Sequence, residues 1–174
     1  VGNALAVSMD STLSASQDGY SNLAQVVVGR TTTIEATLSI TGGDSVTVNN
    51  WNFQITPDSY TLQSQASVGT VTSSSKPTWT VIFNQPGTYT VSISPSCSAA
   101  TCNGDSLTLE AQNPPVLTVT TSSVTLNGGS SVVVSFTVKN TGEATAKGVT
   151  ASITTPSGVS ATPATQTVTE SGLA

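Results

Sequence analysis

Apolar residues alternate with small polar ones along most of this chain, in short runs separated by segments rich in Gly, Pro and Asn. A period of two is typical of strands that bury one face, and turn residues between the runs indicate many short strands. The clearest runs are residues 31–40, 79–83 and 89–93. The last two flank the sequence Asn-Gln-Pro-Gly at residues 84–87, which predicts a hairpin with a Pro-Gly turn. The pattern as a whole predicts an all-β fold.

The composition agrees with this expectation. The chain has 27 Ser and 31 Thr, a third of its 174 residues, whereas only 7% of its residues are charged. Thr and Val favour strands, while long helices draw on Ala, Leu, Glu and Lys. The length suits one large or two small domains, and an apolar fraction of 36% can supply a modest core to each.

The alternation breaks once in the middle of the chain, at Gln112-Asn113-Pro114-Pro115. Proline removes hydrogen-bond donors and stiffens the chain, as in a linker. We therefore predict two domains, residues 1–113 and 114–174. Seven of the eight aromatic residues precede the break and only Phe136 follows it, so the two cores are expected to differ in kind.

The first domain resembles an immunoglobulin-like sandwich. A Trp in an early strand, Trp51, is followed by a later strand with the sequence Gly-Thr-Tyr-Thr-Val at residues 87–91, similar to the tyrosine corner of that fold. The resemblance is one of pattern, because the cysteine pair that joins the sheets of antibody domains is missing. It implies two packed antiparallel sheets.

The second domain resembles the CARDB-like (cell-adhesion-related) domains of long secreted proteins from archaea and bacteria. The resemblance covers residues 116–174 and rests on Val-Lys-Asn-Thr-Gly at 138–142, Val-Thr-Ala-Ser-Ile at 149–153 and Pro-Ser-Gly at 156–158. Two or three further strands normally follow in that family. The resemblance therefore implies an immunoglobulin-like sandwich that lacks its closing strands within this sequence.

Charge and residue types argue against several functions. The net charge is −5 with four cationic residues, so no basic stripe for nucleic acid is expected. No apolar run reaches the roughly 18 residues that would span a membrane, so no transmembrane segment is expected in this sequence. There is no His, and the carboxylates are scattered. We expect no enzymatic activity, no metal site and no cofactor.

The two cysteines, Cys97 and Cys102, are predicted to form a disulfide at the tip of a hairpin. Zinc would require further soft ligands, which the sequence does not offer. A disulfide indicates an oxidising compartment. Because the chain starts at Val1 rather than Met, we interpret it as a mature secreted form, located outside the cell or on its surface.

Tandem sandwiches, a surface rich in hydroxyl groups and an unfinished second domain favour a structural subunit of an extracellular filament. The missing strand would come from the N-terminal segment of another copy, in which Leu5, Val7 and Met9 alternate. Head-to-tail donation of this kind generates a fibre of identical subunits. It is similar in its assembly to archaeal thread-type pilins and to bacterial chaperone-usher pilins.

The sequence leaves two alternatives open. The first alternative to a filament subunit is the N-terminal part of a longer surface-layer, stalk or adhesin protein. The second is an accessory module of a secreted hydrolase. In the first of these, the second domain is closed by residues of its own chain and needs no donated strand.

Overall fold

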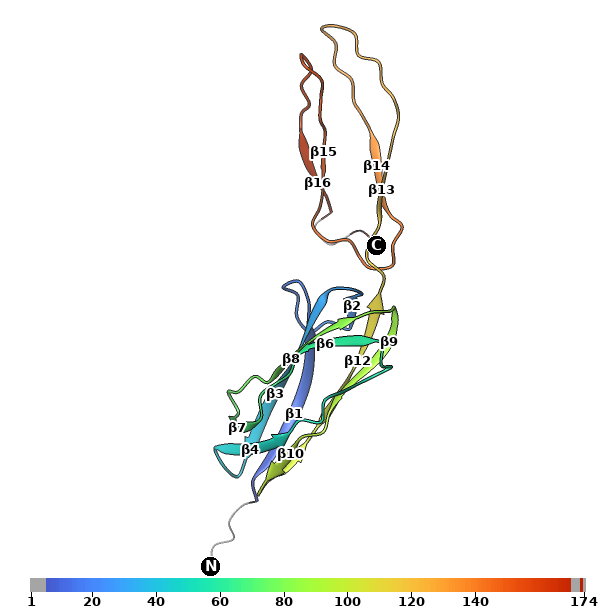
Figure 1. The fold of residues 1–174 in the computed structure, drawn as a ribbon. Helices are drawn as coiled ribbons and strands as arrows, with labels where there is room; N and C mark the ends of the chain where they lie inside the picture. Colours follow the sequence, from blue (N-terminus) through green and yellow to red (C-terminus); the bar gives the residue numbers. More distant parts are fainter. Residues whose placement is uncertain (1–5, 170–172, 174) are drawn as a thin grey trace, which may run out of the picture. The chain divides into compact units, whose positions relative to one another are not determined.

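The computed structural model describes residues 6–169 and Leu173. These residues form strands, turns and loops, and none of them is helical. The all-β prediction is therefore confirmed. The chain divides into two compact units, Val1–Gln112 and Asn113–Ala174, which are drawn in Figure 1.

Unit 1 is built from three sheets. The largest has the order β11-β1-β3-β8-β6, with strands Thr101–Asn103, Ser8–Ser16, Thr31–Thr41, Thr78–Phe83 and Tyr60–Ser64. A second sheet has the order β2-β12-β9-β5, with strands Gln25–Val27, Asp105–Gln112, Gly87–Ile93 and Gln54–Thr56. The smallest has the order β10-β4-β7, with strands Ser96–Ser98, Ser45–Asn50 and Gly69–Thr72.

The core of unit 1 is formed by every second residue of the main strands. Ile34 of β3, Val81 of β8 and Val91 of β9 are fully buried in one continuous cluster. The two tryptophans are also buried, as their alternation with apolar neighbours suggests, and their rings pack edge to face at 5.7 Å. Each large apolar side chain buried in this way contributes about 1.5–3 kcal/mol.

The predicted hairpin of residues 79–83 and 89–93 is wrong. Strand β8 pairs with β3 and β6 in one sheet, whereas β9 pairs with β12 and β5 in another. Residues 84–86 therefore cross from sheet to sheet. The alternation was misleading because two strands that face each other across a core show the same pattern as two strands that pair.

The side chain of Tyr89 stabilises the segment that crosses between the two sheets. The hydroxyl of Tyr89 lies 2.9 Å from the carbonyl oxygen of Gln85 and 3.1 Å from that of Ser59, and both can accept its proton. Bonding from the phenol back to the backbone a few residues upstream is how a tyrosine corner holds its loop.

Strand β1 is longer than the sequence suggests. Its apolar alternation fades after Met9, but the strand continues to Ser16 and pairs with β3 over its whole length. Its buried face carries the small or polar residues Ser11 and Ala15 next to Leu13. The pairing with β3 holds the strand where its own apolar alternation is weak, and β11 adds a second neighbour only at residues 8–10.

Unit 2 consists of two antiparallel pairs of strands. Strand β13 (Leu117–Thr121) pairs with β14 (Phe136–Asn140), and β15 (Val149–Ser152) pairs with β16 (Thr165–Thr169). Val132 and Val134 continue the alternation of β14 toward the N-terminus, but the strand starts only at Phe136. Residues 122–135 therefore extend the first hairpin without strand pairing among the described residues.

Candidate functional site: an apolar groove in the second unit

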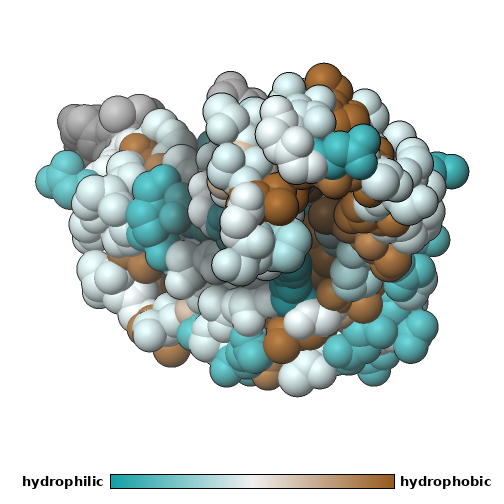
Figure 2. Space-filling view, turned by 90° about the horizontal axis from the view of Figure 1, so that it is seen from above, coloured by the Kyte–Doolittle hydropathy of each residue, from teal (hydrophilic) through white to brown (hydrophobic). Residues whose placement is uncertain are grey.

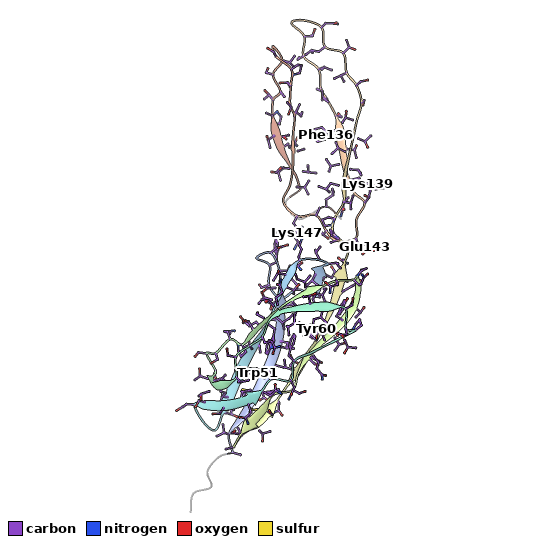
Figure 3. All side chains as sticks on the ribbon, in the orientation of Figure 1. Trp51, Tyr60, Phe136, Lys139, Glu143 and Lys147 are labelled. Carbon is purple, nitrogen blue, oxygen red and sulfur yellow. A yellow bond between two sulfur atoms is a disulfide. The ribbon has the colours of Figure 1, made fainter. Side chains whose placement is uncertain are left out.

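An apolar groove runs between the two hairpins of unit 2. Its volume is about 410 Å³. Strands β13 and β14, the residues just before β14, and the segment through β15 all contribute to its walls. The larger apolar side chains that line it are Leu117, Val119, Val134, Phe136, Val138, Val149 and Ile153. Figure 3 labels Phe136 on its strand.

The alternation of these strands creates the groove. Val119 lies opposite Val138 in the β13–β14 ladder, so both side chains project from the same face of the sheet. Ala151 and Ile153, two residues apart near β15, line the groove from the other hairpin. The first hairpin contributes an apolar face from both of its strands, whereas the second contributes only the segment 149–153.

The groove is poorly covered. Val119 is 61% exposed, Leu117 45% and Val134 40%. Among the described residues, twelve large hydrophobic side chains are exposed, and all except Tyr20 and Val68 belong to unit 2. Hydrophobic residues, in brown, surround a hollow in the face shown in Figure 2. Large exposed apolar surfaces of soluble proteins are commonly interaction sites, which makes this groove the candidate site.

The strand edges beside the groove are also uncovered. A pair of strands leaves one row of backbone N–H and C=O groups unpaired on each outer edge, and such edges are templates for another strand. Within the described part of unit 2, each sheet has only two strands. Unit 2 therefore offers both main-chain hydrogen bonds and apolar side-chain sites to an extended segment.

One buried side chain organises the end of the groove. The carbonyl oxygen of the Asn140 amide accepts hydrogen bonds from the N–H groups of Val116, at 3.1 Å, and Gly142, at 3.0 Å. Its NH₂ group donates to the carbonyl oxygens of Ala144 and Leu173, both at 2.9 Å. Asn140 thereby joins three segments of unit 2 and sets where β13 begins.

The structure places the three candidate donor residues differently. Met9 lies in β1 opposite Ile40 and is fully buried in the core of its own unit. Val7 precedes β1 and packs against that core, and its carbonyl oxygen accepts a hydrogen bond from the N–H of Thr101 at 3.0 Å. Leu5 lies outside the described residues. Met9 is thus already used within its own unit.

The predicted disulfide between Cys97 and Cys102 is present, with Cα atoms 6.1 Å apart. It links β10, which pairs with β4, to β11, which pairs with β1. The bond therefore connects the edges of two different sheets rather than the two arms of one paired hairpin.

Sequence reasoning identified the groove residues as strand residues but did not bring them together into a site. The available signal was the resemblance of the second domain to a larger sandwich, which predicts apolar faces without a cover within this sequence. Over residues 6–169 and Leu173, no group of three or more His, Cys, Asp and Glu side chains is placed to hold a metal ion. In the same part of the chain, no helix is long and apolar enough to cross a membrane.

The fold and the groove define an all-β protein with an open, strand-edged apolar surface in its second unit. No protein-family model, curated protein or solved structure matches the chain. The surface of unit 2 and the chemistry of the chain are therefore the guides to its function.

Proposed function

We propose that this protein is a structural subunit of an extracellular, cell-surface filament, in which each copy inserts an N-terminal strand into the groove of the next copy. The observation that carries the proposal is the open groove between the two hairpins, lined by half-exposed Val and Leu side chains. An added strand would complete the main-chain pairing and cover these side chains in one step.

The donated segment precedes β1. Met9 is excluded from it by its place in the core of unit 1, and Val7 lies against the turn of Gly42 and Gly43. A Cβ on Gly42 would lie 2.6 Å from the carbonyl oxygen of Ala6, so the chain passes very close to this turn. Of the three candidate residues, Leu5 is then left to enter the groove of a neighbour.

Such an interaction is directional. A segment from one end of a subunit binds a different surface on the next subunit, and this heterologous contact does not close upon itself. The result is a fibre. Covering one fully exposed Leu or Val contributes about 1.5–3 kcal/mol. Leu117, Val119 and Val134 are 40–61% exposed and so contribute less each. The main-chain hydrogen bonds of the added strand are therefore needed as well to offset the cost of ordering it.

The disulfide and the low surface charge both agree with assembly outside the cell. A disulfide persists in oxidising, extracytoplasmic compartments. A surface rich in Ser and Thr with few charges adds little electrostatic repulsion between identical subunits. The subunit acts through architecture and not through catalysis.

The acceptor side is tested with two Val→Glu variants. Val119 lines the groove, whereas Val133 is 87% exposed and does not. We expect Val119→Glu to abolish fibres in negative-stain electron microscopy, because the carboxylate would be buried beside the incoming strand. Val133→Glu is the matched control and should assemble normally. Fibres of Val119→Glu that resemble those of the unmodified chain would contradict the proposal.

The donor side is tested by mixing two variants that each carry one introduced cysteine beside the native Cys97–Cys102 disulfide. Chains carrying Leu5→Cys and chains carrying Val119→Cys should form a disulfide-linked pair in high yield, while Leu5→Cys with Val133→Cys should not. If the Val119→Cys chain is instead a monomer of mass above 17.5 kDa whose introduced thiol resists alkylation, residues of the same chain cover the groove, as in a longer surface-layer or stalk protein.

A further inference from the structure

A second, chemically different pocket lies in unit 1. It has a volume of about 340 Å³ and is formed by the segment between β4 and β5, the end of β6 and the loop that leads to β7. This volume falls within the range of small-ligand sites, about 300–1,000 Å³. The pocket belongs to neither the groove nor the N-terminal segment, so a ligand bound here is independent of the proposed assembly.

The polar part of the pocket consists of carboxamides. Four side chains of this type line it, namely Asn50, Asn52, Gln54 and Gln65, and none of its described lining residues is charged. A carboxamide donates through its NH₂ group and accepts through its oxygen. Several of them around one pocket match a ligand that carries many groups able to do both, which is the property of hydroxyls on adjacent carbon atoms.

The apolar part of the pocket is an aromatic floor. The ring of Phe53 stacks on that of Trp79, with centroids 4.9 Å apart and planes within 5°. One face of Phe53 is therefore covered by a buried tryptophan. The residue itself is half-buried and lines the pocket, so the ring is accessible from the pocket side.

The pocket is held in place by hydrogen bonds from residues around it. The indole N–H of Trp51 donates to the carbonyl oxygen of Ser67 at 2.9 Å and fixes the loop before β7. The NH₂ group of Asn52 donates to the carbonyl oxygen of Ser94 at 2.6 Å, and its backbone N–H donates to the side-chain oxygen of Asn50 at 3.1 Å. Binding would thus require little ordering of the backbone.

Two carboxamides remain for a ligand. Among the described residues, the side chains of Gln54 and Gln65 have no protein hydrogen-bond partner, whereas those of Asn50 and Asn52 are bonded to each other at 2.8 Å. Asn50 and Asn52 therefore form a fixed part of the pocket lining, while the side chains of Gln54 and Gln65 can turn toward a ligand.

We propose that this pocket binds a neutral carbohydrate. A sugar ring presents hydroxyl groups at its rim and C–H groups on its face, and this arrangement matches carboxamides placed around a phenyl ring. A phosphate or an acidic sugar would find no cation among the described lining residues. A nucleobase can also stack on an aromatic ring, so adenosine serves as a competitor in the test. A filament subunit with such a site could attach to a glycan surface along its length.

The test is affinity electrophoresis of the full chain in gels that contain a neutral polysaccharide, with glucan, mannan and galactan used in turn. We expect retardation by at least one of them, and none by polygalacturonic acid or heparin. Adenosine added as a competitor should not release the protein.

Point variants then locate the binding. Phe53→Ala should weaken binding about tenfold through the loss of the ring face, while Phe53→Tyr should preserve it. Gln65→Ala removes an exposed side chain and should also weaken binding with the fold intact. Gln85→Ala is the matched control, since Gln85 is an exposed glutamine of unit 1 outside the pocket.

Several outcomes would overturn the proposal. The first is no retardation by any neutral polysaccharide. Retardation by the acidic polymers alone, or release by adenosine, would assign the pocket to another class of ligand. Equal binding by Gln65→Ala and the unmodified chain would place the carbohydrate elsewhere on the molecule, and this result does not depend on whether Phe53→Ala folds.

Discussion

The amide of Gln17 donates a hydrogen bond to the hydroxyl of Thr32, 2.9 Å away, at a position where both residues are almost completely buried. The same NH₂ group donates to the carbonyl oxygen of Val27 at 3.1 Å, and the amide oxygen accepts from the N–H of Val27 at 2.8 Å. One side chain just after β1 therefore completes the hydrogen bonding of β2 and contacts β3.

Gln17→Met keeps the volume of this side chain but removes the partner of the Val27 N–H. It leaves the carbonyl oxygen of Val27 with only the N–H of Arg30, 3.4 Å away. We expect the free energy of unfolding of unit 1 to fall by about 2–3 kcal/mol. Urea unfolding followed by tryptophan fluorescence measures this, because both tryptophans lie in unit 1. Gln25→Met, at an exposed position of β2, is the control. Equal midpoints for the two variants would show that the Gln17 bonds are not needed.

Asn140 allows a finer test in unit 2. Asn140→Asp preserves the oxygen that accepts from Val116 and Gly142 but loses the donor to Ala144 and Leu173. Asn140→Ala loses both functions. We expect hydrogen exchange at the N–H groups of Val116 and Gly142 to accelerate strongly in Asn140→Ala and less in Asn140→Asp. Asn127→Ala, at an exposed turn, should leave exchange at these two sites unchanged.

Gly104 is fixed by close packing. A Cβ at this position would lie 1.9 Å from the carbonyl oxygen of Ile93, a backbone atom that is held in its strand. We expect Gly104→Ala to destabilise unit 1 by about 3 kcal/mol. Gly43→Ala is a graded comparison, because its Cβ would meet only the side chain of Val7 at 3.1 Å. In tryptophan-detected unfolding, the Gly104→Ala variant should be much less stable than the Gly43→Ala variant. The reverse order of stability would contradict the packing argument.

The disulfide closes a small loop, and the chain-entropy model assigns such a loop about 2 kcal/mol. The double variant Cys97→Ala, Cys102→Ala should lose roughly this amount in tryptophan-detected unfolding. Because the bond holds β11 beside β1, exchange should also accelerate at the N–H of Thr101. A reducing agent should lower the midpoint of the unmodified chain and leave that of the double variant unchanged. A reductant effect on both would point to another cause.

The sequence predicted the strand class and the buried residues better than it predicted the pairing. Trp79 and Tyr89 were correctly placed in alternating, inward-facing runs, but their strands proved to lie in different sheets. Period-two alternation indicates which face of the strand a residue occupies. It carries no information about which other strand pairs with it. The polar residue Gln17 was missed for a related reason, since its burial depends on hydrogen bonds to β2 and β3 that no local pattern encodes.

The candidate site was only partly predictable. The expectation of an incomplete second domain predicted uncovered apolar surface. The groove itself depends on how the two hairpins are arranged, which requires the tertiary structure. Val7 and Met9 show the same limit for the predicted donor segment. Their alternation is equally consistent with a donated strand and with the start of β1, and only the pairing of Met9 with Ile40 separates the two.

The first and last long strands of unit 1 each lie between two neighbours. Strand β1 is flanked by β11 and β3, and β12 by β2 and β9. Tension applied to the chain on either side of this unit therefore acts along strands whose hydrogen bonds run across the direction of pull. Those bonds are loaded together in shear and cannot be peeled open one at a time. We therefore expect unit 1 to resist unfolding under such tension, with β1 paired beside a disulfide-bonded neighbour.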